Sequence, residues 1–139
     1  MVVMAIDIGN ASLFNGPYAP SDADLSRCVH CGCCVNTCPT YRVTGLETES
    51  PRGRVFLIDQ VKHGRIPFSD EIERHLEHCL GCRTCESVCP SGVPFGRIIE
   101  HARTELARTR PTRKRRLTRI ALRQVVAHPG RIRLRNARF

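Results

Sequence analysis

The chain has 139 residues, a formal net charge of +9 and an aromatic content of only 5 %, with no tryptophan. A chain of this length forms one domain with at most a short appendage. So few aromatic residues exclude a large apolar core, and something besides apolar packing is expected to help stabilise the fold. Nine cysteines also suit a disulfide-rich secreted protein, but the start of the chain lacks signal-peptide features. The apolar stretch before Asp7 is also too short to span a bilayer. We therefore expect a cytoplasmic protein with reduced thiols.

The charge is concentrated near the C-terminus. Residues 1–102 contain nine Lys or Arg against twelve Asp or Glu, whereas residues 103–139 contain thirteen Lys or Arg against Glu105 alone. This asymmetry predicts a mildly acidic module followed by a basic segment. We divide the chain into an irregular lead-in over residues 1–20, a cysteine-rich domain over residues 21–110 and a basic tail over residues 111–139.

The first predicted helix is short. Ser21 is a typical N-cap, and Asp22 and Asp24 place acidic side chains in the first turn, so a helix is expected to lead into Cys28. The stretch that follows reads Cys28-Val-His-Cys31-Gly-Cys33-Cys34-Val-Asn-Thr-Cys38-Pro39, which is C-x2-C-x2-C-x3-C-P. We expect this motif to be a loop, in which Gly32 adapts the backbone to the sulfurs and Pro39 prevents a helix from starting at Cys38.

The segment between Cys38 and Cys79 is too long for a bare loop, and it contains two helix signatures. Ser50 and Pro51 suit the N-cap and first position of a helix that continues to Gly64, with Val55, Ile58 and Val61 at helical spacing. Ser69 begins another helix, in which Ile72 and Leu76 lead to Cys79.

The second motif, Cys79-Leu-Gly-Cys82-Arg-Thr-Cys85-Glu-Ser-Val-Cys89-Pro90, repeats the first at an offset of 51 residues. A third helix is predicted from the apolar face of Phe95, Ile98, Ile99, Ala102 and Leu106, before Pro111. Residues 113–128 have the amphipathic pattern of one more helix, with Leu117, Ile120, Ala121 and Val125 on one side. No alternating strand pattern is present. We therefore expect an all-α fold with a basic, partly helical C-terminal segment.

The cysteine spacing indicates two [4Fe–4S] clusters, because C-x2-C-x2-C-x3-C-P is the ligand run of bacterial two-cluster ferredoxins. Paired C-x2-C units also bind zinc, but a third cysteine at the same step, a fourth and then proline favour iron–sulfur ligation. In such ferredoxins the fourth cysteine binds the other cluster. We therefore assign Cys28, Cys31, Cys34 and Cys89 to the first cluster, and Cys79, Cys82, Cys85 and Cys38 to the second.

Cys33 and several polar residues near the motifs have no assigned ligand role. Cys33 is either an alternative ligand or reactive thiol or, as we favour, a small packing residue. Arg83, inside the second motif, is expected to stabilise the reduced cluster and raise its potential. Four histidines near the motifs could tune a cluster potential or replace a ligand; they are His30, His75, His78 and His101. Because each cluster already has four thiolates, we interpret most of them as surface residues.

No nucleophile–base pair, phosphate loop or dinucleotide fingerprint is present, so we expect a non-catalytic electron carrier rather than an enzyme acting alone. For the basic tail, docking to an acidic partner is favoured over binding at an anionic membrane surface. Nucleic-acid binding is the least favoured interpretation, because aromatic residues for base stacking are missing apart from Phe139.

Residues 28–41, the helix start Ser50-Pro51-Arg52-Gly53-Arg54 and residues 78–93 together resemble the iron–sulfur subunit of bacterial glycolate oxidase. The resemblance extends to the related subunits of anaerobic glycerol-3-phosphate dehydrogenase and heterodisulfide reductase, and it covers about residues 22–110. The Pro-Arg-Gly-Arg helix start and the long segment between the motifs are its more specific features.

This resemblance implies an α-helical ferredoxin domain that carries electrons from a partner FAD subunit, which oxidises glycolate or another 2-hydroxy acid, toward a quinone or another carrier. Members of that family continue into a C-terminal half with cysteine-rich CCG repeats, whereas this chain has no cysteine after Cys89. We expect a truncated or split form or a shorter relative. A stand-alone ferredoxin, a heterodisulfide-reductase-type subunit and a zinc-dependent regulatory or nucleic-acid-binding protein are the alternatives.

Overall fold

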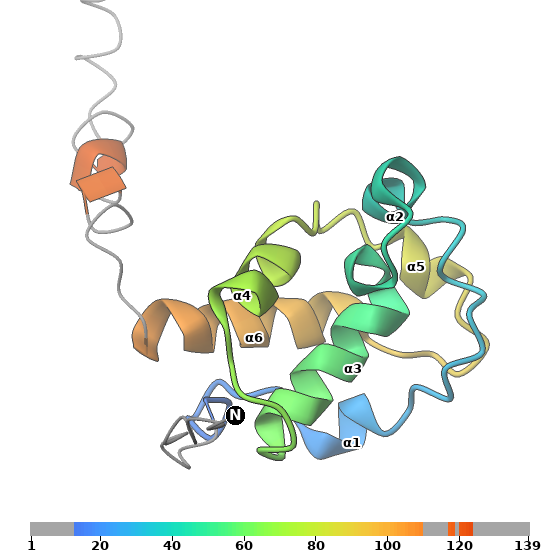
Figure 1. The fold of residues 1–139 in the computed structure, drawn as a ribbon, viewed down its shortest axis with the longest axis horizontal. Coiled ribbons are helices and arrows are strands. Elements are labelled where there is room, and N and C mark those ends of the chain that lie inside the picture. Colours follow the sequence, from blue (N-terminus) through green and yellow to red (C-terminus); the bar gives the residue numbers. More distant parts are fainter. Residues whose placement is uncertain (1–12, 110–116, 119, 124–139) are drawn as a thin grey trace, which may run out of the picture. The chain divides into compact units, whose positions relative to one another are not determined.

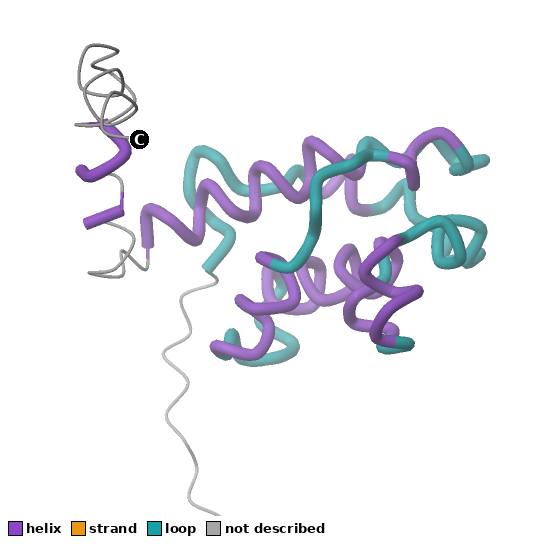
Figure 2. Tube along the Cα trace, turned by 90° about the horizontal axis from the view of Figure 1, so that it is seen from above, coloured by secondary structure: helices purple, strands orange, loops and turns teal. Residues whose placement is uncertain are grey.

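The computed structural model describes residues 13–109, 117, 118 and 120–123, and this part of the chain contains helices and loops but no strand (Figures 1 and 2). The chain divides into two compact units, Met1–Leu106 and Ala107–Phe139. The expected all-α class is therefore confirmed for the described residues. Both cysteine motifs lie in the first unit.

Residues 13–109 contain six α-helices and one 3₁₀-helix, joined by loops (Figure 1). The short helices α1, α2 and η1 come first, and the longer helices α3, α4 and α6 follow, with the short α5 between α4 and α6. Their bounds are α1 Asp22–Leu25, α2 Pro39–Thr44, η1 Glu47–Glu49, α3 Pro51–Lys62, α4 Asp70–Glu77, α5 Thr84–Ser87 and α6 Phe95–Thr109.

Three serines start helices as the sequence predicts. The hydroxyl oxygens of Ser21, Ser50 and Ser69 accept hydrogen bonds from backbone N–H groups of the first turns of α1, α3 and α4. Each cap satisfies a donor that the helix itself leaves without a partner. Pro51 at the first position of α3 needs no hydrogen-bond acceptor, which suits this helix start.

The apolar core is formed mainly by α3, α4 and α6. The apolar residues that helical spacing predicts for α3, α4 and α6 are buried, and Ile58, Leu76 and Ile98 are completely inaccessible to solvent. Phe14 from the lead-in is also fully buried and packs edge-on against Phe68, with 6.5 Å between the ring centres. The core therefore has few large side chains, as the composition predicts, and cysteines of both motifs pack against it.

Arginines of α6 connect this helix to two earlier elements. Arg97 donates hydrogen bonds to both carboxylate oxygens of Asp24 in α1, and its Nε lies 2.9 Å from Oδ2. Arg103 donates to the carbonyl oxygens of Leu76, Glu77 and Cys79, at the end of α4 and the start of the second motif. A cation at a helix C-terminus satisfies free carbonyl groups and opposes the negative end of the helix dipole. These contacts fix the segment that leads into Cys79.

The sequence prediction was incomplete around the motifs. It missed α2, η1 and α5, and α1 ends before Cys28 rather than reaching it. Cys38 has extended backbone angles, as expected before a proline, but Pro39 itself begins α2. The second motif is not entirely a loop either, since it contains α5. These helices are too short to show an apolar period, and α2 buries none of its residues.

The described residues of the second unit beyond residue 109 are helical at 117, 118 and 120–123, within the predicted helix over residues 113–128. Leu117, Ile120 and Leu122 are all at least half exposed. The remainder of that predicted helix, including Val125, lies outside the described residues. In the described part of the chain, every helix is too short or too polar to span a bilayer.

Candidate iron–sulfur centres

The cysteines of the two motifs line two cavities in the first unit. The first cavity has a volume of about 440 Å³, which includes space open to solvent. Six cysteines line it, four from the first motif and two from the second. Those at the four predicted ligand positions are Cys28, Cys31, Cys34 and Cys89, and the other two are Cys33 and Cys85.

The second cavity has a volume of about 310 Å³, again including open space. It brings together three cysteines of the second motif and the last cysteine of the first. They are Cys38, Cys79, Cys82 and Cys85. Cys85 also lines the first cavity, together with Pro51 and Phe95, so these three residues separate the two sites.

The two motifs share an unusual backbone conformation. His30 and Gly81, which correspond under the 51-residue offset, have φ angles of 54° and 67°. Gly32 and Arg83 also correspond, with φ angles of 85° and 57°. Left-handed backbone at a residue other than glycine costs roughly 1–2 kcal/mol. Each motif thus has glycine at one of these positions and a strained residue at the other, which indicates that the cysteine arrangement requires this chain path.

Backbone and hydroxyl groups donate hydrogen bonds to several of the sulfurs. The N–H of Val93 lies 3.4 Å from the Cys89 sulfur, and the N–H of Gly81 lies 3.5 Å from the Cys79 sulfur. The hydroxyl of Thr84 lies 3.6 Å from the Cys82 sulfur. Such donors stabilise thiolates and the negative charge of a cluster.

The thiols differ in the ease with which they lose a proton. Hydrogen bonds from Cys33 hold the pKa of Cys31 below its ordinary value, and those from Thr84 do the same for Cys82. Burial instead raises the pKa of Cys85 to about 12. Because metal ligation requires thiolates, proton loss from Cys85 has to accompany cluster binding.

Burial also raises the pKa of Cys28 and Cys34. For Cys34, a hydrogen bond from the backbone N–H of Arg52 opposes this effect. Arg52 lies in the first turn of α3, where backbone N–H groups have no partner within the helix. The start of α3 therefore presents a donor to the first cavity.

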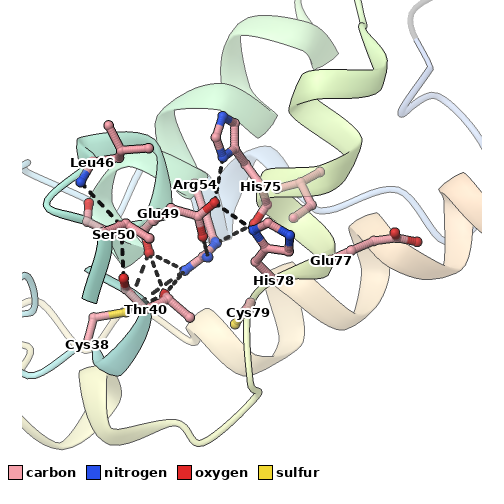
Figure 3. A network of polar contacts seen from close by, with 12 residues as sticks. Cys38, Thr40, Leu46, Glu49, Ser50, Arg54, His75, Glu77, His78 and Cys79 are labelled. Carbon is pink, nitrogen blue, oxygen red and sulfur yellow. Dashed lines mark hydrogen bonds and ion pairs between the residues drawn. The ribbon is translucent and has the colours of Figure 1, made fainter. Parts of the chain in front are cut away.

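The side chain two positions later, Arg54, faces the second cavity and is completely buried (Figure 3). One of its terminal nitrogens, Nη1, lies 3.9 Å from the Cys38 sulfur and 3.1 Å from the Thr40 hydroxyl oxygen. The same nitrogen donates to the Glu49 carbonyl oxygen, and Nη2 pairs with the Glu49 carboxylate. Nε donates to the His75 carbonyl oxygen over 2.7 Å. All three nitrogens of the guanidinium are therefore engaged.

Glu49 completes this buried network. Its carboxylate oxygen Oε1 lies 2.6 Å from Nδ1 of His75 and 3.0 Å from Nδ1 of His78 (Figure 3). Burial opposes ionisation of Glu49, but its hydrogen bonds to the two histidines and the charge of Arg54 hold its pKa below the ordinary value. The network therefore contains a buried Arg54–Glu49 ion pair, and Nη1 of its guanidinium points toward the Cys38 sulfur.

Two further residues singled out from the sequence line the cavities. Arg83 lines the second cavity, is half exposed and pairs with Glu100 over 2.8 Å, and Cys33 lines the first cavity and is exposed. The expected effect of Arg83 on a cluster potential stays a prediction. His75 is not a simple surface residue, because its side chain is only 13 % exposed and bonds Glu49. His30 packs edge-on against Phe56, and His101 is partly buried in α6.

The sequence interpretation missed the buried Arg54–Glu49 pair. A signal was present, because Arg54 lies one turn before Ile58 and therefore on the buried face of α3. Glu49 gave no comparable signal, since η1 is too short to have a pattern. The role of Gly53 was missed for a similar reason: a Cβ at this position would overlap the carbonyl oxygen of Glu47.

Residues 24–93 match the family model described as a 4Fe-4S dicluster domain. No solved structure matches the chain significantly. The donor set agrees with this family, because each cavity gathers at least four cysteine thiols, the ligand type that [4Fe–4S] clusters use. The expected [4Fe–4S] cofactor is thereby confirmed, while the assignment of individual ligands stays a prediction.

Curated relatives agree with the resemblance stated from the sequence. The glycolate oxidase iron–sulfur subunit of Escherichia coli (strain K12) is 44 % identical over 118 residues, which are 84 % of this chain and 28 % of that protein. The probable glycolate oxidase iron–sulfur subunit of Bacillus subtilis (strain 168) is 49 % identical over 83 residues, 59 % of this chain and 19 % of that protein. The chain therefore spans less than a third of either relative.

A third relative comes from Methanosarcina mazei. It is a subunit of the ferredoxin:CoB-CoM heterodisulfide reductase and is 38 % identical over 72 residues, which are 52 % of this chain and 40 % of that protein. The similarity to heterodisulfide reductase that the sequence indicated is thus confirmed as well.

Proposed function

The chain belongs to the family of 4Fe–4S dicluster domains, and from this premise we propose that it binds one [4Fe–4S] cluster in each cavity and transfers electrons between them. The first cluster is bound by Cys28, Cys31, Cys34 and Cys89, and the second by Cys79, Cys82, Cys85 and Cys38. Cys33 is not a ligand in this proposal.

The observation that carries the proposal is the reciprocal lining of the cavities. Each contains the first three ligand-position cysteines of one motif and the last cysteine of the other, and the first cavity contains Cys33 and Cys85 as well. This is the arrangement in which the last cysteine of each run ligates the other cluster. The two sites are separated by only Pro51, Cys85 and Phe95, which line both, so the clusters are close enough for electron exchange.

We further propose that the module serves a flavin-linked dehydrogenase of the glycolate oxidase type. It accepts electrons from a partner FAD subunit that oxidises glycolate or a related 2-hydroxy acid, and passes them toward a quinone or another carrier. The similarity to two glycolate oxidase iron–sulfur subunits supports this assignment. Similarity to a heterodisulfide reductase subunit supports the alternative, in which the module serves a reductase of that type.

Domain limits and location belong to the same proposal. The ferredoxin domain comprises residues 21–110, between a lead-in over residues 1–20 and a basic tail over residues 111–139. The surplus of Lys and Arg in the tail supports docking to an acidic partner or peripheral contact with the inner face of the cell membrane.

Anaerobic purification with iron and sulfide counting, followed by EPR of the reduced protein, tests the cofactor proposal. We expect two interacting [4Fe–4S] signals from the chain. Fewer than two clusters per chain after complete reconstitution would contradict it.

Co-purification from the native host tests the partner. Recovery with an FAD protein that reduces the clusters in the presence of glycolate supports the glycolate oxidase assignment. Reduction only by a heterodisulfide reductase system supports the alternative.

A further inference from the structure

The segment that begins α3 contributes one arginine to each cavity, and the two arginines have different surroundings. Arg52 lines the first cavity and Arg54 lines the second. Each pairs with a glutamate five residues earlier, Glu47 and Glu49 respectively. The pairs are therefore matched in sequence, which makes a direct comparison possible.

Exposure separates the two pairs. The side chains of Arg52 and Glu47 are 32 % and 48 % exposed, whereas those of Arg54 and Glu49 are 0 % and 2 % exposed. Water and salt screen the first pair, while charges in the interior act over the same distance with much less screening. Arg54 is therefore placed to act more strongly on its cavity than Arg52 does.

The contacts of Arg54 also have a direction. Nη1 faces the Cys38 sulfur, whereas Nη2 points to the Glu49 carboxylate (Figure 3). The Glu49 carbonyl oxygen is only 3.5 Å from the same sulfur, and Nη1 donates to both. The Thr40 hydroxyl lies 3.2 Å from this sulfur and also donates to the Glu49 carbonyl oxygen, over 2.9 Å. Of these two donors only Arg54 carries a charge, and a positive charge favours the thiolate form of Cys38.

We propose that Arg54 is a positioning residue for the second cluster: its guanidinium fixes the sulfur of Cys38 and raises the midpoint potential of that cluster. The inference rests on the proposed function, because it requires Cys38 to be a ligand. Hydrogen bonds to cluster sulfurs and nearby charge are established determinants of iron–sulfur potentials. A positive charge held at the sulfur stabilises the reduced, more negative cluster.

Redox titration of the full chain with both clusters bound, monitored by EPR, tests the proposal in four variants. We expect Arg54→Met to lower one midpoint potential and leave the other unchanged. Arg54→Lys keeps the charge and restores most of that shift. Glu49→Gln removes a buried negative charge and moves the same potential upward. Arg52→Met is the matched control, and its smaller shift falls on the other cluster.

Opposite signs for Arg54→Met and Glu49→Gln separate this role from a purely structural one, which would lower cluster occupancy in both variants without a signed shift. If Arg54→Met retains too little iron, Arg54→Lys and Glu49→Gln decide the question. An unchanged potential in Glu49→Gln, with both clusters present, overturns the proposal. A wild-type chain that binds fewer than two clusters contradicts the proposed function instead, so the two failures are distinguishable.

Discussion

The two cavities have the same cysteine spacing and the same left-handed backbone positions, yet their linings differ. The first is bordered by a solvent-exposed ion pair, Arg52–Glu47, and the second by a buried one, Arg54–Glu49. Corresponding cysteines differ too, because Cys85 is buried while its counterpart Cys34 is partly exposed. The repeat thus determines which cysteines lie together, while the inserted helices determine the electrostatic surroundings of each site.

The start of α3 produces this difference, because it packs between the two sites. Pro51 lines both cavities, and α3 packs closely against η1, which carries Glu49. Changes at this helix start are therefore expected to affect both cavities, whereas changes farther along each motif should affect only one.

Substitution of Gly53 is expected to have the largest effect. The Cβ of Gly53→Ala would overlap the Glu47 carbonyl oxygen, and since backbone cannot move aside cheaply, we expect a loss of about 3 kcal/mol or more. Both clusters should be lost together, as measured by iron content after anaerobic reconstitution. Gly45→Ala, where φ is +68° but nothing lies within 4 Å of the added atom, is the control for backbone strain without a clash, and it should cost only about 1 kcal/mol. Loss of a single cluster would show that α3 does not support both sites.

Thiol reactivity in the cluster-free chain should differ strongly among the cysteines, both within the second motif and between the corresponding residues Cys34 and Cys85. Because the pKa of Cys85 is about 12 against an ordinary value of 9.0, its thiolate fraction near pH 8 is about a thousandfold below that of an ordinary thiol. Iodoacetamide labelling read by peptide mass spectrometry should therefore modify Cys31 and Cys82 first and Cys85 last. The rate at Cys85 should keep rising with pH beyond the point at which Cys82 levels off. Equal rates at Cys34 and Cys85 would contradict the difference in burial.

The two glutamates provide a matched stability comparison. Glu49→Ala leaves Arg54 buried without its partner, which costs about 3–5 kcal/mol, whereas Glu47→Ala breaks an exposed pair worth about 1 kcal/mol or less. Guanidinium denaturation of the cluster-loaded chain, followed by circular dichroism, measures both.

The pH dependence of the Glu49 contribution has a defined sign. The pKa of Glu49 is lowered in the folded chain, so its stabilising effect is present above the ordinary carboxyl pKa and is lost as the pH falls through the folded value. In the denaturation experiment, equal losses of unfolding free energy in Glu49→Ala and Glu47→Ala would contradict the distinction between a buried and an exposed ion pair.

The smallest effects are expected at the shared backbone positions. Gly81→Ala places a side chain at a φ of +67° with no neighbour within 4 Å, so we expect a loss of about 1 kcal/mol from backbone strain alone. Gly32→Ala adds a close approach to the guanidinium of Arg52 and should cost slightly more. Thermal unfolding of the loaded chain measures both. An unchanged unfolding temperature in Gly81→Ala would mean that the left-handed conformation at this position is not required.

Sequence patterns were sufficient for α3, α4 and α6, because α3 and α4 have serine caps and all three helices have a buried apolar stripe. The four cysteines that the spacing assigns to each cluster lie at one cavity, while their roles as ligands stay predictions. The left-handed conformation of His30 and Arg83 had no sequence signal, because neither residue type requires it. The buried partner of Arg54 could not be predicted, since contacts between η1, α3 and α4 depend on tertiary packing.

Reciprocal ligation is tested most directly by comparing EPR spectra of single Cys→Ser variants after anaerobic reconstitution. We expect Cys89→Ser to lose the same cluster signal as Cys28→Ser, and Cys38→Ser to lose the same signal as Cys79→Ser. Loss of the Cys79 signal in Cys89→Ser, or of the Cys28 signal in Cys38→Ser, would contradict reciprocal ligation, because each motif would then bind its own cluster with all four of its cysteines.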